Sequence, residues 1–423
     1  MKILIVGSGG REHAIAWKIA QSPRADKIYC APGNAGISEF AECVSIGAME
    51  FDKLAAFAKE KEIDLTVVGM DDSLVGGIVD VFEKEGLRIF GPRKNAAILE
   101  GSKAFSKDLM KKYHIPTAAY ENFDDPKKAL EYLETVKMPI VLKADGLALG
   151  KGVLICNTLE EAKAGVQEIM EDKKFGSAGN TMVIEEFMTG REVSVLSFVD
   201  GKTIKTMTSA QDHKRAKDGD QGLNTGGMGT FSPSPFYTDE VDAYCRKYIY
   251  QPTVDAMAAE GREFKGIIFF GLMLTADGPK VLEYNARFGD PETQVVLPRM
   301  TSDILDAFEA CVDGTLDRTE ITFEDNAAVC VVLASDGYPV SYQKGYPISG
   351  LETFRDKENY YVFHAGTKFD GDAIVTNGGR VLGVTATGKD LKSARANAYE
   401  ATEWISFENK YMRHDIGKAI DEA

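Results

Sequence analysis

The segment from Leu282 to Gln294 carries residue types that are suited to phosphate chemistry. Glu283 and Asn285 are two residues apart in a run that predicts a strand, so their side chains should lie on one face. Both offer hard oxygen ligands of the kind that hold Mg²⁺ beside phosphate groups. Arg287 falls on the same face and would be costly in a buried core. The segment therefore predicts a site for a metal ion and a phosphorylated ligand.

The turn Gly7-Ser8-Gly9-Gly10-Arg11-Glu12-His13 joins the first predicted strand to the first predicted helix. Glycines at such a place let backbone N–H groups approach a phosphate at the helix N-terminus. A dinucleotide fingerprint would need glycine in place of Glu12 and an acidic residue after the second strand, which instead ends in Cys30-Ala31-Pro32-Gly33-Asn34. A nicotinamide cofactor is thus disfavoured, and a phosphorylated small molecule is favoured over a tight turn without a ligand.

A second glycine-rich segment runs from Lys143 to Val153 between two predicted strands and contains three glycines. It is not a Walker A loop, because no helix follows it and no Gly-Lys-Ser/Thr sequence closes it. Its free N–H groups and its pliancy suit a lid over a triphosphate. A glycine-rich hairpin without a ligand is the alternative.

Two further segments combine charge with a turn. Glu185 and Glu186 end an apolar strand and Glu192 follows, so that their carboxylates could accept hydrogen bonds from an adenine amino group or from ribose hydroxyls. A solvated strand end is the alternative for this segment. The stretch from Asp212-His213-Lys214-Arg215 to Asn224-Thr225-Gly226-Gly227-Met228-Gly229 is too polar and glycine-rich to be core, and a loop of this length indicates function.

The elements that position these segments follow from hydrophobic periodicity. Residues 1–100 alternate strands (2–6, 27–30, 63–68 and 87–90) with helices (11–21, 51–62 and 74–84), which predicts a parallel sheet with ligands at its carboxyl edge. A helix from 101 to about 114, with Ser102 as N-cap, leads to a small lobe at 117–187 with strands 139–143, 152–156 and 181–186. In that lobe, Thr158 and Glu161 predict a capping box that opens a helix to about 171.

The second half of the chain predicts strands at 193–199, 267–274 and 281–284, and a helix over 239–260 that Pro252 should kink. Further strands are expected at 327–334, 360–364 and 381–387, and a helix at 391–405. The 423 residues include 44% hydrophobic and 27% charged residues, which excludes a disordered chain, a collagen-like chain and a small disulfide scaffold. The net charge of −16 argues against binding to nucleic acid or to an anionic membrane.

The six cysteines form no C-x-x-C pair and no zinc-ligand spacing, which indicates buried, reduced thiols. The N-terminal apolar run is too short for a signal peptide, and the longest apolar stretch, 267–274, is far below a membrane span. We therefore expect a soluble, cytoplasmic protein.

The stretch Arg287-Phe288-Gly289-Asp290-Pro291-Glu292-Thr293-Gln294 resembles the characteristic segment of the phosphoribosylamine–glycine ligase (glycinamide ribonucleotide synthetase) family. The segments at 6–14, 32–36, 224–229, 362–367 and 378–382 resemble the same family, in the same order. The resemblance implies a multidomain α/β and α+β fold, an ATP-grasp core with a Rossmann-like parallel-sheet domain before it and a small domain after it. The implied bounds are 1–101, 102–322, which contains the mobile lid lobe 117–187, and 323–423.

The resemblance also implies an activity, the ATP-dependent joining of glycine to 5-phosphoribosylamine through a glycyl phosphate, which is the second step of de novo purine synthesis. ATP would be a co-substrate and Mg²⁺ or Mn²⁺ the cofactor. The protein would act as a monomer on small molecules, with transient hand-over of substrate from the preceding amidotransferase. One alternative is another ATP-grasp carboxylate–amine ligase with a different acceptor. A catalytically silent nucleotide sensor is a further alternative, against which the intact Lys143, Glu283, Asn285 and Arg287 argue.

The roles that the resemblance implies fall into four groups. Catalysis would rest on Arg287, Asp290 and Lys143, and metal binding on Glu283 and Asn285. ATP would be bound by Lys103, Lys143, Gly146, Gly150, Gly152, Glu185, Phe187 (through its backbone) and Glu192. The other substrates would be bound by Gly9, Gly10, Arg11, Asn34, Asp71, Asp212, Lys214, Asn224, Thr225, Gly226 and Asp290.

Two positions depart from the family pattern. Met70-Asp71 replaces the usual Pro-Glu pair, which puts the hydrogen bond of Asp71 to the ribose in doubt. Gly271 stands where several ATP-grasp enzymes have a second metal carboxylate, so the metal would rely more on Glu283, Asn285 and ATP itself.

Overall fold

A computed structural model describes residues 1–148 and 150–423 of the chain. Its first part is a five-stranded sheet in the order β3-β2-β1-β4-β5, and every pair of neighbouring strands is parallel, as the alternation of strands and helices predicts. The strands are β1 (Lys2–Gly7), β2 (Lys27–Pro32), β3 (Glu42–Cys43), β4 (Leu65–Val68) and β5 (Ile89–Phe90). The helices are α1 (Gly10–Ala20), α2 (Phe51–Glu60), α3 (Asp71–Gly76), α4 (Ile78–Lys84) and α5 (Lys94–Gly101).

The expected single helix over residues 74–84 is instead two helices, α3 and α4. Gly77 separates them with a φ of +98°, a left-handed conformation that ends one helix and that glycine adopts without strain. Because α3 begins at Asp71, before the expected start, this carboxylate lies at a helix N-terminus on the carboxyl side of β4.

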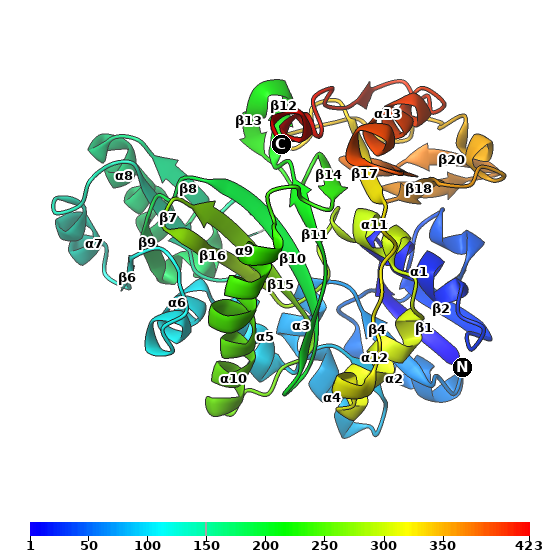
Figure 1. Cartoon of the computed structure of the whole chain (residues 1–423), viewed down its shortest axis with the longest axis horizontal. Coiled ribbons are helices and arrows are strands. Elements are labelled where there is room, and N and C mark those ends of the chain that lie inside the picture. The colour runs from blue at the N-terminus through cyan, green and yellow to red at the C-terminus, as the bar shows by residue number, and fades with distance from the viewer. Residues whose placement is uncertain (149) are drawn as a thin grey trace.

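The lobe at 117–187 is a four-stranded antiparallel sheet in the order β6-β9-β7-β8, and it stands away from the first sheet with α7 and α8 beside it (Figure 1). Its elements are β6 (Tyr120–Phe123), α7 (Pro126–Leu133), β7 (Ile140–Ala144), β8 (Val153–Cys156), α8 (Leu159–Val166) and β9 (Met182–Glu186). The hydroxyl of Thr158 accepts a hydrogen bond from the N–H of Glu161, so the predicted cap is present. The other half of the capping box differs, because Glu161 accepts from the N–H of Asn157. The lobe is joined to the first domain through α6 (Lys103–Lys112), whose N-cap is Ser102 as predicted.

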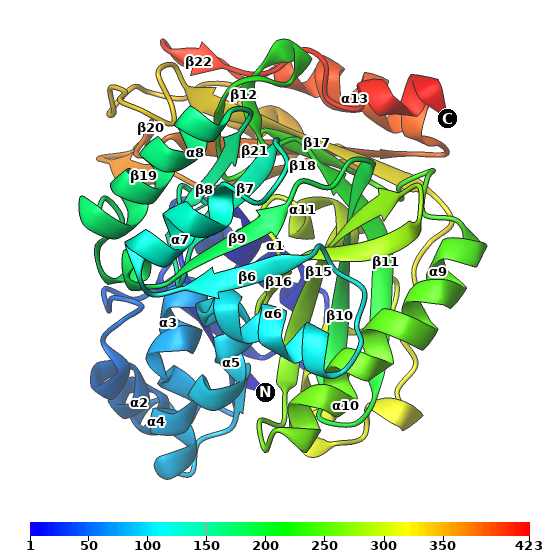
Figure 2. The ribbon, with the colours of Figure 1, turned by 90° about the vertical axis from the view of Figure 1, so that its left-hand side faces the viewer.

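A nine-stranded sheet forms the rest of the fold, with the path β16-β15-β10-β11-β14-β17-β21-β18 and β22 paired to β17. Its strands are β10 (Arg191–Asp200), β11 (Ile204–Asp212), β14 (Gly229–Ser232), β15 (Lys265–Thr275), β16 (Gly278–Asn285), β17 (Ala327–Ser335), β18 (Tyr360–His364), β21 (Arg380–Gly388) and β22 (Lys410–Tyr411). Figure 2 shows β17, β18 and β21 above β10, β11 and β15. Short β14 bridges the two groups, so one sheet runs from the middle of the chain into its C-terminal part.

The segment predicted as a polar functional loop between Asp212 and Gly229 contains the hairpin of β12 (Arg215–Lys217) and β13 (Gln221–Asn224). A second hairpin joins β19 (Thr367–Asp370) and β20 (Ala373–Thr376). The remaining helices are α9 (Asp239–Cys245), α10 (Gln251–Ala259), α11 (Thr293–Val296), α12 (Ile304–Asp313) and α13 (Leu391–Thr402).

The expected kink at Pro252 takes the form of a π-helical turn. Residues 246–250 form this turn between α9 and α10, and Pro252 lies in the first turn of α10. Proline has no N–H to donate to the carbonyl four residues earlier. The π-helical turn interrupts the regular hydrogen bonds at this point, so the missing donor of Pro252 costs less there.

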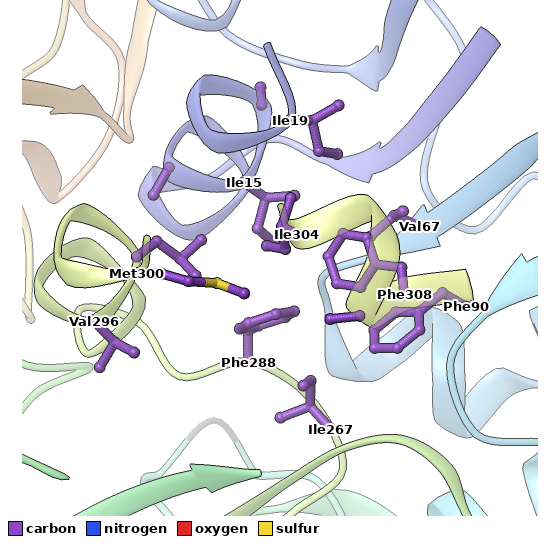
Figure 3. Close-up of a cluster of buried hydrophobic side chains, with 14 of the residues drawn as sticks. Ile15, Ile19, Val67, Phe90, Ile267, Phe288, Val296, Met300, Ile304 and Phe308 are labelled. Atoms are coloured by element: carbon purple, nitrogen blue, oxygen red, sulfur yellow. The ribbon is translucent and has the colours of Figure 1, made fainter. Parts of the chain in front are cut away.

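One large hydrophobic core joins the first sheet to the middle of the chain. Ile15 and Ile19 of α1 lie against Ile304 and Phe308 of α12 in this core, which Figure 3 shows in close-up. Phe288 points into it and is 1% exposed. Phe288 thereby anchors the segment between Arg287 and Asp290 next to α1. Over residues 1–148 and 150–423, none of the helices has both the length and the hydropathy needed to cross a bilayer.

Candidate active site

Lys143 and Glu185 lie on neighbouring antiparallel strands of the lobe and form a buried ion pair. Residue 143 of β7 is opposite Val183 of β9, so Glu185 is its diagonal neighbour on the same face. The second carboxylate oxygen of Glu185 is 2.7 Å from Nζ of Lys107 in α6. Although burial opposes its charge, these two lysines lower the pKa of Glu185, which is 2% exposed. The structure thus presents Glu185 to two cations, one of them the expected phosphate-binding lysine.

The glycine-rich loop of the lobe is tied to the start of α6. Nζ of Lys103 donates to the carbonyl oxygens of Ala144 (3.1 Å) and Gly146 (2.8 Å). In the other direction, Asp145 Oδ1 accepts from the N–H of Ala104 at 3.1 Å, as suits a carboxylate at a helix N-terminus. Burial first, and then the charge of Lys143, lower the pKa of Lys103. Both expected phosphate lysines therefore lie beside this loop.

Glycine is required within the loop for conformation and for space. Gly146 and Gly150 have φ values of +91° and +72°, where other residues are strained. A Cβ at Gly152 would come within 2.7 Å of the Cβ of Ala148. Leu149, inside the expected lid loop, lies outside the described residues.

Glu283 is paired with Lys214. Nζ of Lys214 is 3.2 Å from Glu283 Oε1 and 3.4 Å from Glu192 Oε2, so this lysine joins an expected metal ligand to an expected ribose ligand. The charge of Lys214 outweighs burial and lowers the pKa of Glu283 to about 2, which keeps its carboxylate ionised at neutral pH. Glu192 and Glu283 in turn raise the pKa of Lys214.

Asn285 and Arg287 are held by an acidic residue that precedes α6. Asn285 Nδ2 donates to Glu100 Oε1 at 3.0 Å, the N–H of Ala286 donates to Glu100 Oε2 at 2.7 Å, and a terminal nitrogen of Arg287 lies 3.2 Å from Glu100 Oε1. The Nε of Arg287 is buried and has no hydrogen-bond partner among the described residues. An unpaired buried donor of this kind is available to an anionic ligand.

The pair Glu283 and Asn285 fits a hard divalent cation. Residue 284 is buried while 283 and 285 are half-buried, so the two oxygen-bearing side chains share a face as predicted. Gly271 pairs with Glu283 across β15 and β16, and a Cβ there would come within 2.8 Å of the Glu283 side chain. Its glycine thus leaves room around the carboxylate. No group of three or more His, Cys, Asp or Glu side chains in the described part of the chain is placed to hold a metal.

Asp290 is bound by groups from three parts of the chain. The N–H of Arg11 at the start of α1 donates to its Oδ2 at 3.3 Å, and Gln294 Nε2 donates to its Oδ1 at 2.8 Å. Arg380 of β21 donates to its carbonyl oxygen at 3.0 Å and lies 3.6 Å from Oδ1. Burial opposes the charge of Asp290, but Arg380 and Arg11 together lower its pKa, so the carboxylate is ionised at neutral pH.

Glu12 explains physically why the first glycine-rich turn is not a dinucleotide site. Its buried carboxylate accepts from the N–H of Gly9 and from Nε of Arg11, each at 3.0 Å, and takes up the N–H that a phosphate would use. A Cβ at Gly7 or Gly69 would come within 2.7 Å of the Glu12 side chain, so this carboxylate fills the space above β1 and β4.

The expected substrate residues of the first domain differ in their surroundings. Arg11 also donates to the carbonyl oxygen of Phe288 at 3.3 Å. Although burial opposes its charge, Glu12, Asp290 and Asp71 raise the pKa of Arg11, which places Asp71 in the same cluster. A Cβ at Gly10 would be 2.6 Å from Gln294 Nε2, so glycine allows this close approach. Asn34 is used within the protein, because Nδ2 donates to the carbonyl oxygens of Ser8 and His364 and Oδ1 accepts from the N–H of Ile37.

The segment between Asp212 and Gly229 also reaches the centre. A Cβ at Gly227 would lie 2.5 Å from Pro291 and 2.8 Å from Asp212, so this turn packs directly on the 290–291 segment. Burial and the nearby Glu292 raise the pKa of Asp212. Thr225 bonds to the carbonyl oxygen of Lys214, and the N–H of Gly226 donates to Tyr338. Asn224 is exposed at the end of β13.

The segment that connects the lobe to the large sheet follows Glu186. Met188 is buried there in a small apolar cluster with Ala118 and Met273, against which Leu282 packs. Met273 lies on β15, Met188 follows Phe187, and Leu282 lies on β16 beside Glu283, so an apolar surface adjoins the charged centre. Such a surface suits a flat aromatic base.

Several residues of this centre escape prediction from the sequence, namely Glu100, Lys107, Gln294 and Arg380. Lys107 gives one signal, because it lies four residues after Lys103 on a helix and so shares its face. Glu100 and Arg380 give none, because their partners are 185 and 90 residues away along the chain.

Three family models match successive parts of the chain. They are the phosphoribosylglycinamide synthetase N domain over residues 1–100, its ATP-grasp (A) domain over 101–293 and its C domain over 328–419. The curated phosphoribosylamine–glycine ligase of Halalkalibacterium halodurans is 52% identical over 423 residues, which is 100% of this chain and 98% of that protein. Its counterpart from Caldanaerobacter subterraneus is 49% identical and covers 98% of this chain and 99% of that protein.

Solved structures agree with this match. The crystal structure of phosphoribosylamine–glycine ligase from Thermotoga maritima has 35% identity and a TM-score of 0.87, and the match covers 99% of this chain and 100% of that one. The biotin carboxylase domain of a Hydrogenobacter thermophilus 2-oxoglutarate carboxylase has 16% identity and a TM-score of 0.74, covers 97% and 91%, and shares the fold alone. The three-part α/β architecture with an ATP-grasp core is thereby confirmed, and the chain belongs to the phosphoribosylglycinamide synthetase family.

Proposed function

We infer that this chain is an ATP-dependent ligase that joins glycine to 5-phosphoribosylamine and releases glycinamide ribonucleotide, ADP and phosphate. The observation that carries this inference is the family match over nearly the whole chain, with relatives of this name at about half identity. The geometry supports it, because Arg11, Asp290 and Arg380, from the first domain, the middle and the C-terminal part, meet beside Arg287. We also propose that the protein works as a monomer.

We assign the phosphates of ATP to the two lysines and the glycine-rich loop of the lobe. Lys103 and Lys143 lie beside the loop, and Gly146, Gly150 and Gly152 would offer N–H groups for phosphate oxygens. The base would lie on the apolar cluster at Met188, with Phe187 supplying backbone contacts, and Glu192 would accept from the ribose hydroxyls. Glu185 would keep Lys143 in place through their ion pair and would border the base.

We assign Mg²⁺, or Mn²⁺ in its place, to Glu283 and Asn285. The ionised carboxylate of Glu283 and the amide oxygen of Asn285 are hard ligands on one face, with space left by Gly271. When bound, the metal would neutralise charge on the phosphate oxygens.

The reaction must first activate glycine, because a carboxylate is a poor electrophile. A carboxylate oxygen of glycine attacks the γ-phosphorus of ATP, the bond to ADP breaks, and glycyl phosphate forms. The amine of phosphoribosylamine then attacks the acyl carbon, phosphate leaves, and the amine gives up a proton. Arg287 would oppose the charge on the transferred group through its unpaired Nε, and Asp290 would orient the amine.

The phosphoribosyl group would lie along the N-terminal end of α1. Arg11 would supply a cation and Gly10 an N–H donor to it, and Asp71 acts on the same Arg11. Asp212, Lys214 and Thr225–Gly226 would close the glycine side. Asn34 would not touch the substrate but would hold the glycine-rich turn in place through its hydrogen bond to the carbonyl oxygen of Ser8. Closure of the lobe at 117–187 over this centre would exclude water, which otherwise hydrolyses the acyl phosphate.

This division of work supports the three units at 1–101, 102–322 and 323–423. We also propose that the protein acts in the cytoplasm and receives its labile amine by transient hand-over from the preceding amidotransferase. A second candidate, a ligase of the same fold with a different amine acceptor, is favoured by the Met70-Asp71 departure beside the substrate cluster.

The test is ADP release measured with each substrate omitted in turn and with other carboxylate–amine pairs. The expected result is turnover that needs glycine and phosphoribosylamine together. Turnover with another amine at higher kcat/KM would favour the second candidate. No turnover with any pair would favour a nucleotide sensor.

A further inference from the structure

Glu100 is a buried carboxylate outside the strand that carries the metal ligands. It lies in the last turn of α5 and its side chain is 5% exposed. Its two oxygens contact three successive residues. They accept hydrogen bonds from the side chain of residue 285 at 3.0 Å and the N–H of residue 286 at 2.7 Å, and form an ion pair with residue 287 at 3.2 Å. One carboxylate thus fixes the whole segment that follows β16.

The contact with Asn285 decides which end of its amide faces the phosphate site. A carboxylate oxygen can only accept, so Glu100 binds the Nδ2 end of the amide. The Oδ1 end then points away from Glu100, and it is the end that can ligate a cation. Without the carboxylate, the two ends of an amide are nearly equal in shape and either could face a ligand.

The contact with Arg287 fixes a second group at the same centre. One terminal nitrogen is engaged by Glu100 and the other donates to the carbonyl oxygen of Phe288 at 3.2 Å. These two contacts hold the guanidinium plane and leave its buried Nε unpaired. A guanidinium held at two points loses little entropy when it binds an anion.

We propose that Glu100 is a positioning residue that orients the amide of Asn285 for metal binding and the guanidinium of Arg287 for the transferred phosphoryl group. This proposal rests on the proposed function for the identity of the ligands. It adds that a residue of α5, outside the ATP-grasp strands, determines which end of the Asn285 amide faces the metal. Burial raises the pKa of Glu100, whereas Arg287 and the N–H of Ala286 oppose that rise.

The test is an exchange of donor and acceptor. In Glu100→Gln, the new amide can present a donor to the Asn285 donor, which favours rotation of Asn285 and turns its nitrogen toward the metal. In Asn285→Asp, two carboxylates face each other. In the double variant Glu100→Gln/Asn285→Asp, an amide again faces a carboxylate, the net charge of the cluster equals that of the native chain, and a carboxylate oxygen remains for the metal.

The readout is the dissociation constant of ADP, by calorimetry, with and without Mg²⁺, which needs neither glycine nor phosphoribosylamine. We expect Mg²⁺ to lower the dissociation constant of ADP in the native chain, and we call the ratio of the two constants the Mg²⁺ factor. Each single variant should reduce the Mg²⁺ factor about tenfold, which is the effect of losing one well-placed hydrogen bond to a charged group. The double variant should regain the native factor to within about threefold. The exposed Glu83→Gln, on α4, is the matched control and should behave as native.

Recovery in the double variant supports the positioning role. If each substitution only disturbed the structure, the two losses of Mg²⁺ dependence would add up in the double variant and would not cancel. A double variant that folds but has no more Mg²⁺ dependence than the weaker single variant would overturn the proposal. So would a Glu100→Gln variant with native Mg²⁺ dependence. If Glu100→Gln does not fold, Asn285→Asp and the double variant still decide the question. Because ADP binding is scored without the ligase substrates, a wrong substrate assignment would leave this result unchanged.

Discussion

The N–H of Arg11 donates a hydrogen bond to Asp290 Oδ2 at 3.3 Å, although the two residues are 279 positions apart. The contact joins the N-terminus of α1 to the segment that follows the metal-ligand strand. Its energy is favourable in two ways, since the carboxylate meets both an N–H group and the positive end of the helix. The residue that we assign to orient the amine is thereby fixed to the domain that we assign to the phosphoribosyl group.

Asp290→Asn should uncouple the two half-reactions. The amide keeps the shape of the side chain but lacks the charge that faces Arg11 and Arg380. We expect kcat for glycinamide ribonucleotide to fall about 10²-fold, while KM for ATP stays within about threefold. ADP release should then exceed product release, because glycyl phosphate waits for its amine and is hydrolysed. The two rates are measured by a coupled assay and by chromatography, with Asp277→Asn in the exposed turn before β16 as control. Equal rates of ADP release and of glycinamide ribonucleotide release in Asp290→Asn would contradict the role of Asp290.

Arg287→Lys should lower turnover without unfolding the protein. Lysine keeps the charge near Glu100 but cannot also reach the carbonyl oxygen of Phe288 and present a third donor. We expect kcat to fall about 10²–10³-fold and the thermal midpoint to move by only a few degrees. The exposed Arg93→Lys serves as control. A near-native kcat would refute the phosphoryl-transfer role of Arg287.

Lys143→Ala should destabilise the fold as well as weaken ATP binding. It leaves the 2% exposed Glu185 with Lys107 as its remaining ionic partner. Removing one partner from a buried pair costs about 3–5 kcal/mol. Lys163→Ala removes an exposed pair with Glu134 in the same lobe and should cost about 0–1 kcal/mol. Urea denaturation measures the loss of unfolding free energy in both variants. Equal losses would show that the ion pair of Glu185 contributes no more to stability than an exposed pair does.

Mild acid should destabilise the interface between the first domain and the C-terminal part. His13 and His364 meet there, and the N–H of His364 donates to Nδ1 of His13 at 2.7 Å. Burial lowers the pKa of both, that of His364 to about 4 against a usual value of 6.5. The neutral buried histidines bind protons less readily than they do in the unfolded chain, so stability falls as the pH drops below 6.5. The part of this fall that comes from His364 ends at about pH 4.

The measurement is the urea midpoint between pH 7 and 4 for native chain and for His364→Gln. The substitution removes one of the two histidines and should reduce the pH slope in this window. The exposed His114→Asn is the control and should keep the native slope. A slope that is unchanged in His364→Gln would contradict this account of the interface.

Much of the fold was predictable because its elements carry strong local signals. The parallel sheet of the first domain follows from buried strands that alternate with amphipathic helices, and Ser102 and Thr158 act as the predicted caps. The break at Gly77 and the hairpin of β12 and β13 were not predicted. Both depend on how the chain packs against distant segments, which local periodicity does not report.

The candidate site was predictable where chemistry and spacing coincide. Glu283 and Asn285 share a face because strand residues two apart must do so, and Lys143 flanks a glycine-rich turn that only glycine can form. Glu100 and Arg380 could not be predicted, because an acid at the end of a helix and an arginine at the start of a strand are ordinary surface residues until the fold buries them. The partners of Asn34 show the converse, since a polar residue in a promising turn can be used by the protein itself.

The central claim, ligation of glycine through an acyl phosphate, is tested most directly by isotope transfer. Glycine labelled with ¹⁸O in both carboxylate oxygens is incubated with ATP, Mg²⁺ and phosphoribosylamine, and the released phosphate and the product are analysed by mass spectrometry. The account predicts one ¹⁸O atom in each phosphate and one in the amide of glycinamide ribonucleotide. Phosphate without label, released together with product, would contradict it.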